Sequence, residues 1–484
     1  MNKKLGLAVG IFLTFIVLVS VLFHYPVQII DALTLKPAPG FDVQINPWRV
    51  VFEPFMGLLL FLNRGLYAID EMLLSVWWVV LAFAVYTLYK WFTVKDAEKR
   101  KKFLLLQLVN LPIAVGLWFT YFLVMIFLSA YLPANTIENK TENSILVTTH
   151  SHSQFSHDGL ISQDNLMKWH KYNNYDAFFI TDHNNHAKTL DFVNAQRKGE
   201  IVSEPLVMGG EEFGGTNHMS LLGLKSYEKT KGMTDSAAVA MVRANGGAVI
   251  INHWFDGEHM SLEYYRDLGV DGFEIENSAT NTSYDRNVYK KIREFCEANG
   301  LIMNGGLDFH GYGNVCSLWN AMEIPGWHDM SQDAKERAIL DVIKSKDQSK
   351  LKVLLYNDRP YYQEKNLFLM IPVHIFNYFR TINFWQILSW AAWALLFVFV
   401  KIKISECKKE KVLFNANNMA AILGVLGALF MLGLGLFYYG ETFKVAGSDN
   451  DIYIEYAELL FYFGGAFLIY SGIVTWFRLK KKKA

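Results

Sequence analysis

Six long apolar segments constrain this chain more than any other feature of its sequence. A helix needs about 17–25 predominantly apolar residues to cross the hydrocarbon core of a bilayer. The composition, with 52% hydrophobic and only 19% charged residues, is that of a membrane protein. We therefore expect six spans. They are Leu5–Phe23, Met72–Tyr89, Ile113–Leu132, Ile382–Val400, Met419–Tyr439 and Ala457–Phe477.

The first apolar segment resembles a signal peptide in one respect, because Lys3 and Lys4 precede it. Its run is longer than the core of a signal peptide, which has about 7–15 residues. No small-x-small cleavage pattern follows at residues 20–23, so we expect an uncleaved anchor. Two further stretches, Phe52–Leu62 and Leu367–Phe379, are apolar but short and interrupted, and we expect them to be interfacial or re-entrant.

Positive charge is confined to alternate connections between the spans. Six basic residues lie within Lys90–Lys102, five within Lys401–Lys411 and five within Arg478–Lys483. The connection Gly440–Tyr456 holds one lysine against four acidic residues. Short cytoplasmic loops carry the excess of Lys and Arg. The sequence therefore predicts a multi-pass protein of the cell membrane, with both termini cytoplasmic and the long segment between spans three and four extracytoplasmic.

Polarity divides the chain into three regions, residues 1–138, 139–365 and 366–484. The outer two each hold three spans, and the middle one has the size of an ordinary domain. The middle region contains 23 Lys and Arg against 31 Asp and Glu, a balance that argues against nucleic acid as a partner. It also holds eleven of the thirteen histidines, which first suggests metal binding.

Short apolar runs alternate with amphipathic ones in the middle region. Helical patterns occupy Asn165–Lys171, Ser236–Ala244 and Asp285–Ala298. Short apolar strands separated by helices are typical of a parallel sheet buried on both faces, and seven of them favour a closed or nearly closed α/β barrel. The expected strands are Ile145–Thr149, Ala177–Thr181, Leu206–Gly209, Met219–Leu224, Ala248–Asn252, Gly272–Glu276 and Leu301–Asn304.

Side chains that can bind metals gather at the ends of these strands, where barrel enzymes build their sites. They are His150, His152, His157 and Asp158 after the first strand, Asp182 and His183 after the second, Glu211 and Glu212 after the third, His218 at the start of the fourth, His253 after the fifth, and Asp308 and His310 after the last.

Two of these groups have a spacing suited to metal binding. Side chains alternate along an extended segment, so His150-x-His152 presents both imidazoles on one face, and Asp308-x-His310 does the same with a carboxylate and an imidazole. We expect the two pairs to face each other across the barrel mouth. Imidazole and carboxylate ligands suit zinc, manganese or iron. Three cysteines, Cys296, Cys316 and Cys407, are too few for a thiolate zinc site.

The order and spacing of these motifs resemble the PHP family, named for its polymerase and histidinol phosphatase members. The family pattern runs H-x-H, an Asp or His, T-D-H, a Glu, two further His and a final D-x-H, and residues 144–311 contain all of it. The resemblance implies an α/β fold, a distorted (β/α)7 barrel, here inserted between two sets of three transmembrane helices. It also implies two or three divalent metal ions and hydrolysis of phosphate esters. The nine metal ligands by this likeness would be His150, His152, Asp158, His183, Glu212, His218, His253, Asp308 and His310.

Two ligand positions offer a choice between neighbouring residues. Asp158 is preferred to His157 because the Asp-Gly pair of the family is intact. Glu212 is preferred to Glu211 because an apolar residue follows it, as in the family pattern. Trp254 stands where a proline is common in the family.

The resemblance also suggests roles for individual side chains. Asp158, Glu212 and Asp308 are the expected catalytic carboxylates, with Glu212 bridging the metals. Asp182 is expected to orient the ring of His183. The phosphate-binding cation is left open among Lys188, Arg243 and Arg286.

Together these features favour a membrane-tethered phosphoesterase that acts through a hydroxide activated by two or three metal ions. Tethering predicts contact with membrane lipid and a substrate near the outer leaflet, either a phosphorylated small molecule, a lipid or a wall-polymer phosphate. Ligating imidazoles must be neutral, so activity is expected to fall in acid. The alternative is a non-catalytic receptor or transport accessory that binds metal or ligand. The complete ligand set favours the enzyme.

Overall fold

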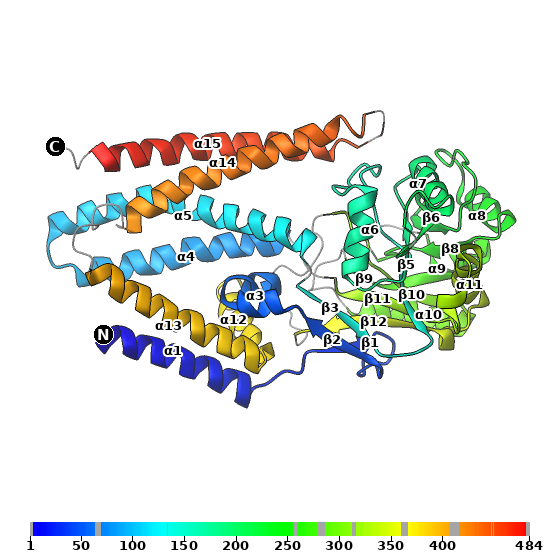
Figure 1. Ribbon diagram of the computed structural model, residues 1–484, viewed down its shortest axis with the longest axis horizontal. Helices are drawn as coiled ribbons and strands as arrows, with labels where there is room; N and C mark the ends of the chain where they lie inside the picture. Colours follow the sequence, from blue (N-terminus) through cyan, green and yellow to red (C-terminus); the bar gives the residue numbers. More distant parts are fainter. Residues whose placement is uncertain are drawn as a thin grey trace.

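The computed structural model describes residues 3–480, except 63–68, 133, 203, 256–259, 279–285, 312–315, 360–365, 407–415, 447 and 449. A region of long helices and a sheet-based domain follow one another along the long axis of the molecule (Figure 1). The start of α1 (Lys3–Leu22) and the end of α15 (Ile452–Lys480) lie at the end of the helical region that is remote from the domain.

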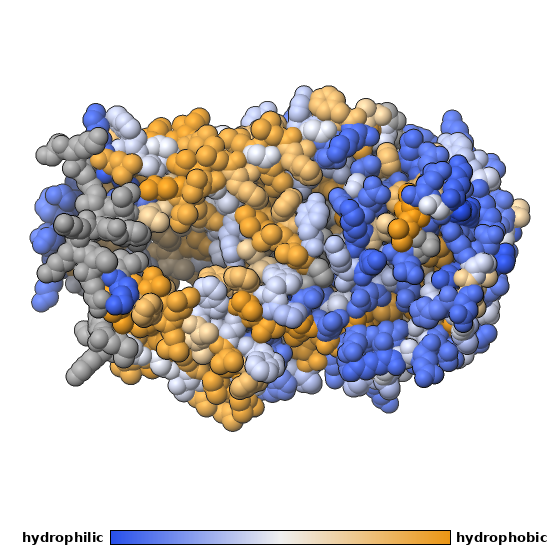
Figure 2. All heavy atoms as spheres, viewed as in Figure 1, coloured by the Kyte–Doolittle hydropathy of each residue, from blue (hydrophilic) through white to orange (hydrophobic). Residues whose placement is uncertain are grey.

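Among the described residues, six helices are long and apolar enough to cross a membrane, the same number as the expected spans. Apolar side chains cover the helical region, whereas polar ones cover the domain (Figure 2). Leu395 and Ile469, for example, are 61% and 66% exposed. Continuous apolar surface of this kind is rare in water-soluble proteins and fits contact with lipid. The six are α1, α4 (Ile69–Thr93), α5 (Ala97–Tyr131), α13 (Phe384–Glu406), α14 (Ala416–Thr442) and α15.

Helices that precede the domain pack against helices that follow it. Ile16 of α1 shares a buried cluster with Phe379 of α12 (Met370–Thr381), and Trp390 of α13 packs against that cluster. A second cluster joins Ile113 of α5 to residues of α14 and α15. The spans therefore do not separate into two independent three-helix units.

The two short apolar stretches form helices near the junction with the domain. They are α3 (Glu53–Leu62), preceded by α2 (Pro47–Val51), and α12. Glu53 is fully buried, accepts a hydrogen bond of 2.9 Å from the hydroxyl of Tyr378, and lies 3.4 Å from Arg49. Buried charges need such partners. The interfacial location of these helices stays a prediction.

One curled sheet of ten strands forms the domain, in the order β1-β12-β11-β4-β5-β6-β7-β8-β9-β10. All seven expected strands are present, as β4 to β10. The strands are β1 (Gln28–Asp31), β4 (Ser144–Thr148), β5 (Ala177–Ile180), β6 (Leu206–Gly214), β7 (His218–Leu222), β8 (Ala248–Ile251), β9 (Gly272–Asn277), β10 (Ile302–Gly306), β11 (Leu318–Glu323) and β12 (Leu351–Asn357).

The expectation of an all-parallel sheet was wrong for part of it. β4, β5 and β6 pair in parallel, as do β8, β9 and β10, but β7 is antiparallel to both of its neighbours. The expected third strand ended at Gly209, whereas β6 continues to Gly214, and only residues 215–217 connect it to β7. So short a connection can join only antiparallel strands.

Side-chain amides link the two ends of the curled sheet. Asn320 of β11 accepts a hydrogen bond from the Gly305 nitrogen at 2.7 Å and donates one to the Gly305 carbonyl at 2.8 Å. Gln348 makes the same pair of bonds with the backbone of Met303, at 2.7 and 3.0 Å. β10 is thereby held beside β11 and β12 without a backbone ladder.

Polar caps begin most helices of the domain. Ser162 caps α6, because its hydroxyl accepts a hydrogen bond from the Asn165 nitrogen, and Thr234 caps α8 in the same way. The helices are α6 (Gln163–Tyr172), α7 (Ala187–Arg197), α8 (Asp235–Ala244), α9 (Leu262–Leu268), α10 (Arg286–Asn299) and α11 (Gln332–Ser345), with short 3₁₀ turns at Trp327–Asp329 and Gln348–Lys350.

The segment between the first and second spans also contributes to the domain. β1 pairs antiparallel with β12, and β2 (Phe41–Ile45) pairs with β3 (Asn135–Asn139) in a separate two-stranded sheet. The boundaries at residues 138 and 365 stay predictions. The described structure adds residues 28–45 to the elements that build the domain.

Candidate metal centre

The nine expected ligands converge on one point, with Glu212 at its centre. Its Oε2 atom lies 3.1–3.3 Å from the Nε2 atoms of three histidines, and its Oε1 atom lies 3.1–3.2 Å from a ring nitrogen of two others. The three are His150, His152 and His183, and the two are His218 and His253.

The remaining three expected ligands complete the cluster. Asp308 Oδ1 lies 3.2 Å from the Nε2 atoms of both His150 and His152. Asp158 Oδ2 lies 3.0 Å from His310 Nε2. Among the described residues, donor atoms within 4.8 Å of one another form three overlapping groups: His152, Asp158, His183 and His310; His150, His152, Glu212 and Asp308; and His183, Glu212 and His218.

The geometry also distinguishes the neighbours between which the sequence left a choice. Asp158 lies in the cluster, whereas the side chain of His157 is 58% exposed and its Nε2 lies 3.9 Å from Asp158. Glu211 points to the opposite face of β6, where it pairs with the buried His186. Alternation along a strand has this consequence, because adjacent residues face opposite sides.

The H-x-H segment (150–152) and the D-x-H segment (308–310) lie side by side, and they do not face each other across a barrel mouth as expected. Ser151 and Phe309 form a parallel bridge. The His152 nitrogen donates to the Phe309 carbonyl and the Asp308 nitrogen donates to the His150 carbonyl, both at 2.9 Å. Two extended segments in register therefore present their side chains to the same point.

Buried partners fix the rings that carry the ligand atoms. Glu274 Oε1 lies 2.8 Å from His150 Nδ1. A carboxylate only accepts, so this nitrogen carries a proton, and Nε2 is the ring atom that faces the cluster and is free to bind a metal once it is deprotonated. The Ser156 hydroxyl donates to Asp158 Oδ1 at 2.8 Å. Its oxygen lies 3.2 Å from His152 Nδ1 and can accept the proton on that nitrogen.

Two of the nine residues have strained backbones. The φ angles of His253 and Asp308 are 21° and 54°, in the region that favours glycine. Such conformations cost about 1–3 kcal/mol each and persist where surrounding contacts impose them. The His253 nitrogen is held by Glu274 Oε2 at 3.0 Å, and the Asp308 nitrogen by the His150 carbonyl. Strain at these positions is typical of a functional site.

Electrostatics in the cluster favour positive charge. Burial lowers the pKa of His150, but Asp308, Glu212 and Glu274 outweigh it and raise that pKa well above its usual value. Burial also lowers the pKa of His152 and of His253, but neighbouring carboxylates outweigh it and raise the pKa to about 10 at His152 and to about 9 at His253. Without metal ions, protons on these three imidazoles balance the carboxylates, whereas burial lowers the pKa of His183 to about 4.

The carboxylates show the complementary effect. Burial raises the pKa of Glu212, but the imidazoles of His150 and His183 outweigh it and hold that pKa well below its usual range. The pKa of Asp158 and of Asp308 is lowered against burial by histidine neighbours in the same way. Ionised carboxylates and convergent imidazole nitrogens form a donor set that fits divalent metal ions such as zinc, manganese or iron.

The cluster is open on one side. The side chains of His150 and His152 have no exposed surface, whereas that of His218 is 42% exposed and that of Asp158 is 22% exposed. Solvent therefore reaches the cluster at His218 and Asp158.

One other expectation was wrong, and the choice of a phosphate-binding cation stays open. Asp182 does not orient the His183 ring: its carboxylate accepts hydrogen bonds from the nitrogen and hydroxyl of Ser153 at 2.6 and 2.7 Å. Lys188 forms an exposed pair with Asp191. Arg243 donates to the Gly269 carbonyl, close to the end of the sheet opposite the cluster. The side chain of Arg286 lies outside the described residues.

Histidines outside the cluster have structural partners. His186, which lies near His183 in the sequence, pairs with Glu211 instead of lining the cluster. His170 stacks on Phe178 with ring centroids 4.0 Å apart, and its Nδ1 lies 2.8 Å from the Leu166 carbonyl. Burial lowers the pKa of His170 to about 3.

Residues that the sequence did not single out as partners surround the ligands. Asn252 donates to Glu212 Oε1 at 2.8 Å, and Asn277 donates to Glu274 Oε2 at 3.0 Å. Glu274 is itself fully buried. A carboxylate next to apolar residues in a buried strand was the available signal, because such a group needs a buried partner.

Comparison with known proteins agrees with the motifs. The model of the PHP domain family matches residues 148–236. This range includes His150, His152, Asp158, His183, Glu212 and His218. A search of curated proteins found no match.

Solved structures give further matches. PsfC from Pseudomonas syringae is 17% identical, covering 48% of this chain and 98% of its own, with a TM-score of 0.34. A candidate metal-dependent phosphoesterase from Bifidobacterium adolescentis is 15% identical, covering 35% and 88%, with a TM-score of 0.28. An amidohydrolase from Chromobacterium violaceum, with bound sulfate and no metal, is 14% identical, covering 39% and 96%, with a TM-score of 0.28. The family match confirms the motif-based prediction, because residues 148–236 of the domain between the third and fourth apolar helices match the PHP domain.

Proposed function

We propose that this protein is a membrane-tethered, metal-dependent phosphoesterase. One observation carries the proposal: six imidazoles and three carboxylates converge on Glu212 and its neighbours in a buried cluster with one open side. Two or three divalent ions, when bound there, supply water activation and neutralisation of phosphoryl charge. The nine residues are the proposed ligands, with Asp158, Glu212 and Asp308 as the catalytic carboxylates.

The surrounding residues support this assignment by what they do to the ligands. Glu274 keeps the proton of His150 on Nδ1, and Ser156 holds both His152 and Asp158. These contacts point the Nε2 atoms of His150 and His152 and the carboxylate of Asp158 into the cluster before any ligand binds. Such preorganisation is a property of catalytic metal sites.

The proposed location follows from the spans and the charge of their connections. The domain is extracytoplasmic and both termini are cytoplasmic if the basic connections lie inside. The proposed substrate is then a phosphate ester at or near the outer leaflet, on a small molecule, a lipid or a wall polymer. Nucleic acid is not a proposed substrate, because the domain is acidic.

The test is hydrolysis of a chromogenic phosphomonoester and phosphodiester by the full chain in detergent, with manganese, zinc or iron added. A paired Asp308→Ala and His310→Ala variant is the control. Metal-dependent turnover that the control lacks supports the enzyme, and the faster ester sets the class. Metal bound without turnover of either ester favours the receptor alternative. A folded chain that binds no metal contradicts the proposal.

A further inference from the structure

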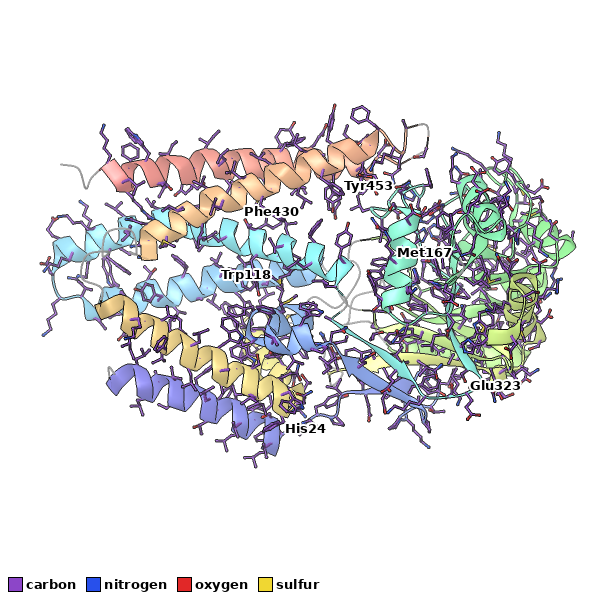
Figure 3. All side chains as sticks on the ribbon, in the orientation of Figure 1. His24, Trp118, Met167, Glu323, Phe430 and Tyr453 are labelled. Carbon is purple, nitrogen blue, oxygen red and sulfur yellow. The ribbon has the colours of Figure 1, made fainter. Side chains whose placement is uncertain are left out.

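The connection between the last two membrane helices reaches the metal-binding loop of the domain. It runs from α14 to α15 at the end of the helical region that faces α6 (Figure 1). Figure 3 labels Tyr453 at the start of α15 and Met167 on the neighbouring face of the domain. Tyr453 and Val445 form a buried apolar cluster with Leu160 of the domain.

A side-chain amide makes polar contact with the domain. Asn450 is 5% exposed, and its Nδ2 lies 2.9, 2.6 and 2.9 Å from the carbonyl oxygens of Gln154, Ser156 and Gly159. One NH₂ group thus serves three backbone acceptors of one turn. Buried carbonyls that lost this donor would be left unsatisfied at a cost of about 1–3 kcal/mol each.

The turn that Asn450 holds carries part of the metal centre. It contains Ser156, whose hydroxyl contacts His152 and Asp158, and it contains Asp158 itself. The turn is tightly folded, because a Cβ atom on Gly159 would lie 1.9 Å from the Ser153 carbonyl. The position of this turn sets where Asp158 lies, 3.0 Å from His310 Nε2 in the cluster.

We propose that Asn450 is a positioning residue for the metal centre, through which the α14–α15 connection holds the turn 153–159 so that Asp158 completes the cluster. The last two membrane helices would then be a working part of the site as well as an anchor. This inference rests on the proposed function insofar as it assigns metal ions to the cluster.

The test compares Asn450→Asp, Asn450→Ala and Asn139→Asp in the full chain in detergent. Asn450→Asp keeps the shape but turns a carboxylate oxygen toward three carbonyls. Asn139 is the matched control, because its amide also donates to a backbone carbonyl, that of Ser144 at 2.7 Å, away from the cluster. Manganese binding to metal-stripped protein is measured by calorimetry, and exchange of backbone amides in residues 153–160 by mass spectrometry.

Both Asn450 variants should bind the most weakly held ion about 10–100-fold less tightly and should exchange faster at residues 153–160, while the control matches the unmodified chain. Unchanged affinity and exchange in the Asn450 variants, or equal losses in the control, would overturn the proposal. If the unmodified chain binds no metal, the proposed function fails, and amide exchange alone still decides whether Asn450 holds the turn.

Discussion

Replacing Glu274 by glutamine should weaken metal binding although Glu274 is not itself an expected ligand. Its Oε1 accepts from His150 Nδ1 at 2.8 Å, and its Oε2 accepts from the His253 nitrogen and from Asn277 Nδ2, both at 3.0 Å. All three partners are donors. A carboxylate satisfies them, whereas glutamine brings only one acceptor oxygen.

Either orientation of the glutamine amide has a cost. If its NH₂ faces His150, that ring must accept at Nδ1 and carry its proton on Nε2, so it can no longer bind a metal. If its NH₂ faces His253 and Asn277, two buried donors lose a charged acceptor, and each such hydrogen bond contributes about 1.5–3 kcal/mol. Outer partners of metal-binding histidines typically change affinity about 10–100-fold, or about 1.4–2.7 kcal/mol.

The assay is a calorimetric titration of the metal-stripped full chain with manganese. Glu211→Gln is the matched control, because Glu211 is also fully buried and also pairs with a histidine Nδ1, that of His186, on the other face of β6. We expect a loss of about 10–100-fold for Glu274→Gln and an affinity within twofold, roughly, of the unmodified chain for Glu211→Gln. Equal losses in the two variants, or none in the first, would refute the reasoning from ring orientation.

Three further changes have definite expected outcomes. Asp158→Asn should lower the number of ions retained after dialysis, counted by mass spectrometry, whereas His157→Asn should leave it unchanged. The pKa values of His152 and His253 are raised to about 10 and about 9, so protons occupy these rings near neutral pH and must leave when metal binds. The affinity for metal should therefore rise with pH, and calorimetry in buffers of different ionisation enthalpy should detect the released protons. The pKa of His170 is lowered to about 3 in the fold, so its ring stays neutral there but takes up a proton when the chain unfolds. The free energy of unfolding should therefore fall by up to about 1.4 kcal/mol per pH unit as the pH drops from about 6.5 toward 3. Urea unfolding of the His170→Phe variant should show a smaller loss of stability over that range.

The sequence predicted those features that depend on short stretches of chain. The spans followed from apolar length, and the seven strands from apolar runs between polar ends. The nine cluster residues followed from motifs at those ends. Because each motif places its side chains by local alternation, His150 and His152 had to share a face wherever the strand lay.

Features that depend on distant pairing were not predicted. Nothing near Gln28–Asp31 indicates that it pairs with β12, which lies more than three hundred residues further along the chain. The direction of β7 was an error of a different kind. The expected third strand ended at Gly209, which made its connection to the next strand look longer than it is, because β6 continues to Gly214.

The expected ligands therefore lie close together in the sequence, whereas the residues that orient them lie far away in it. His150, His152 and Asp158 lie within nine residues of one another, but the group that orients His150 lies 124 residues away, and Asn450 lies 294 residues from Ser156. A change at Glu274 or Asn450 removes no donor atom from the cluster, yet it alters where a lone pair points or where a turn sits. A chain can thus keep every motif of a PHP domain and still lose its metal ions. If the proposal for Asn450 holds, a complete metal centre in this protein requires contacts from the helices that follow the domain as well as from the domain itself.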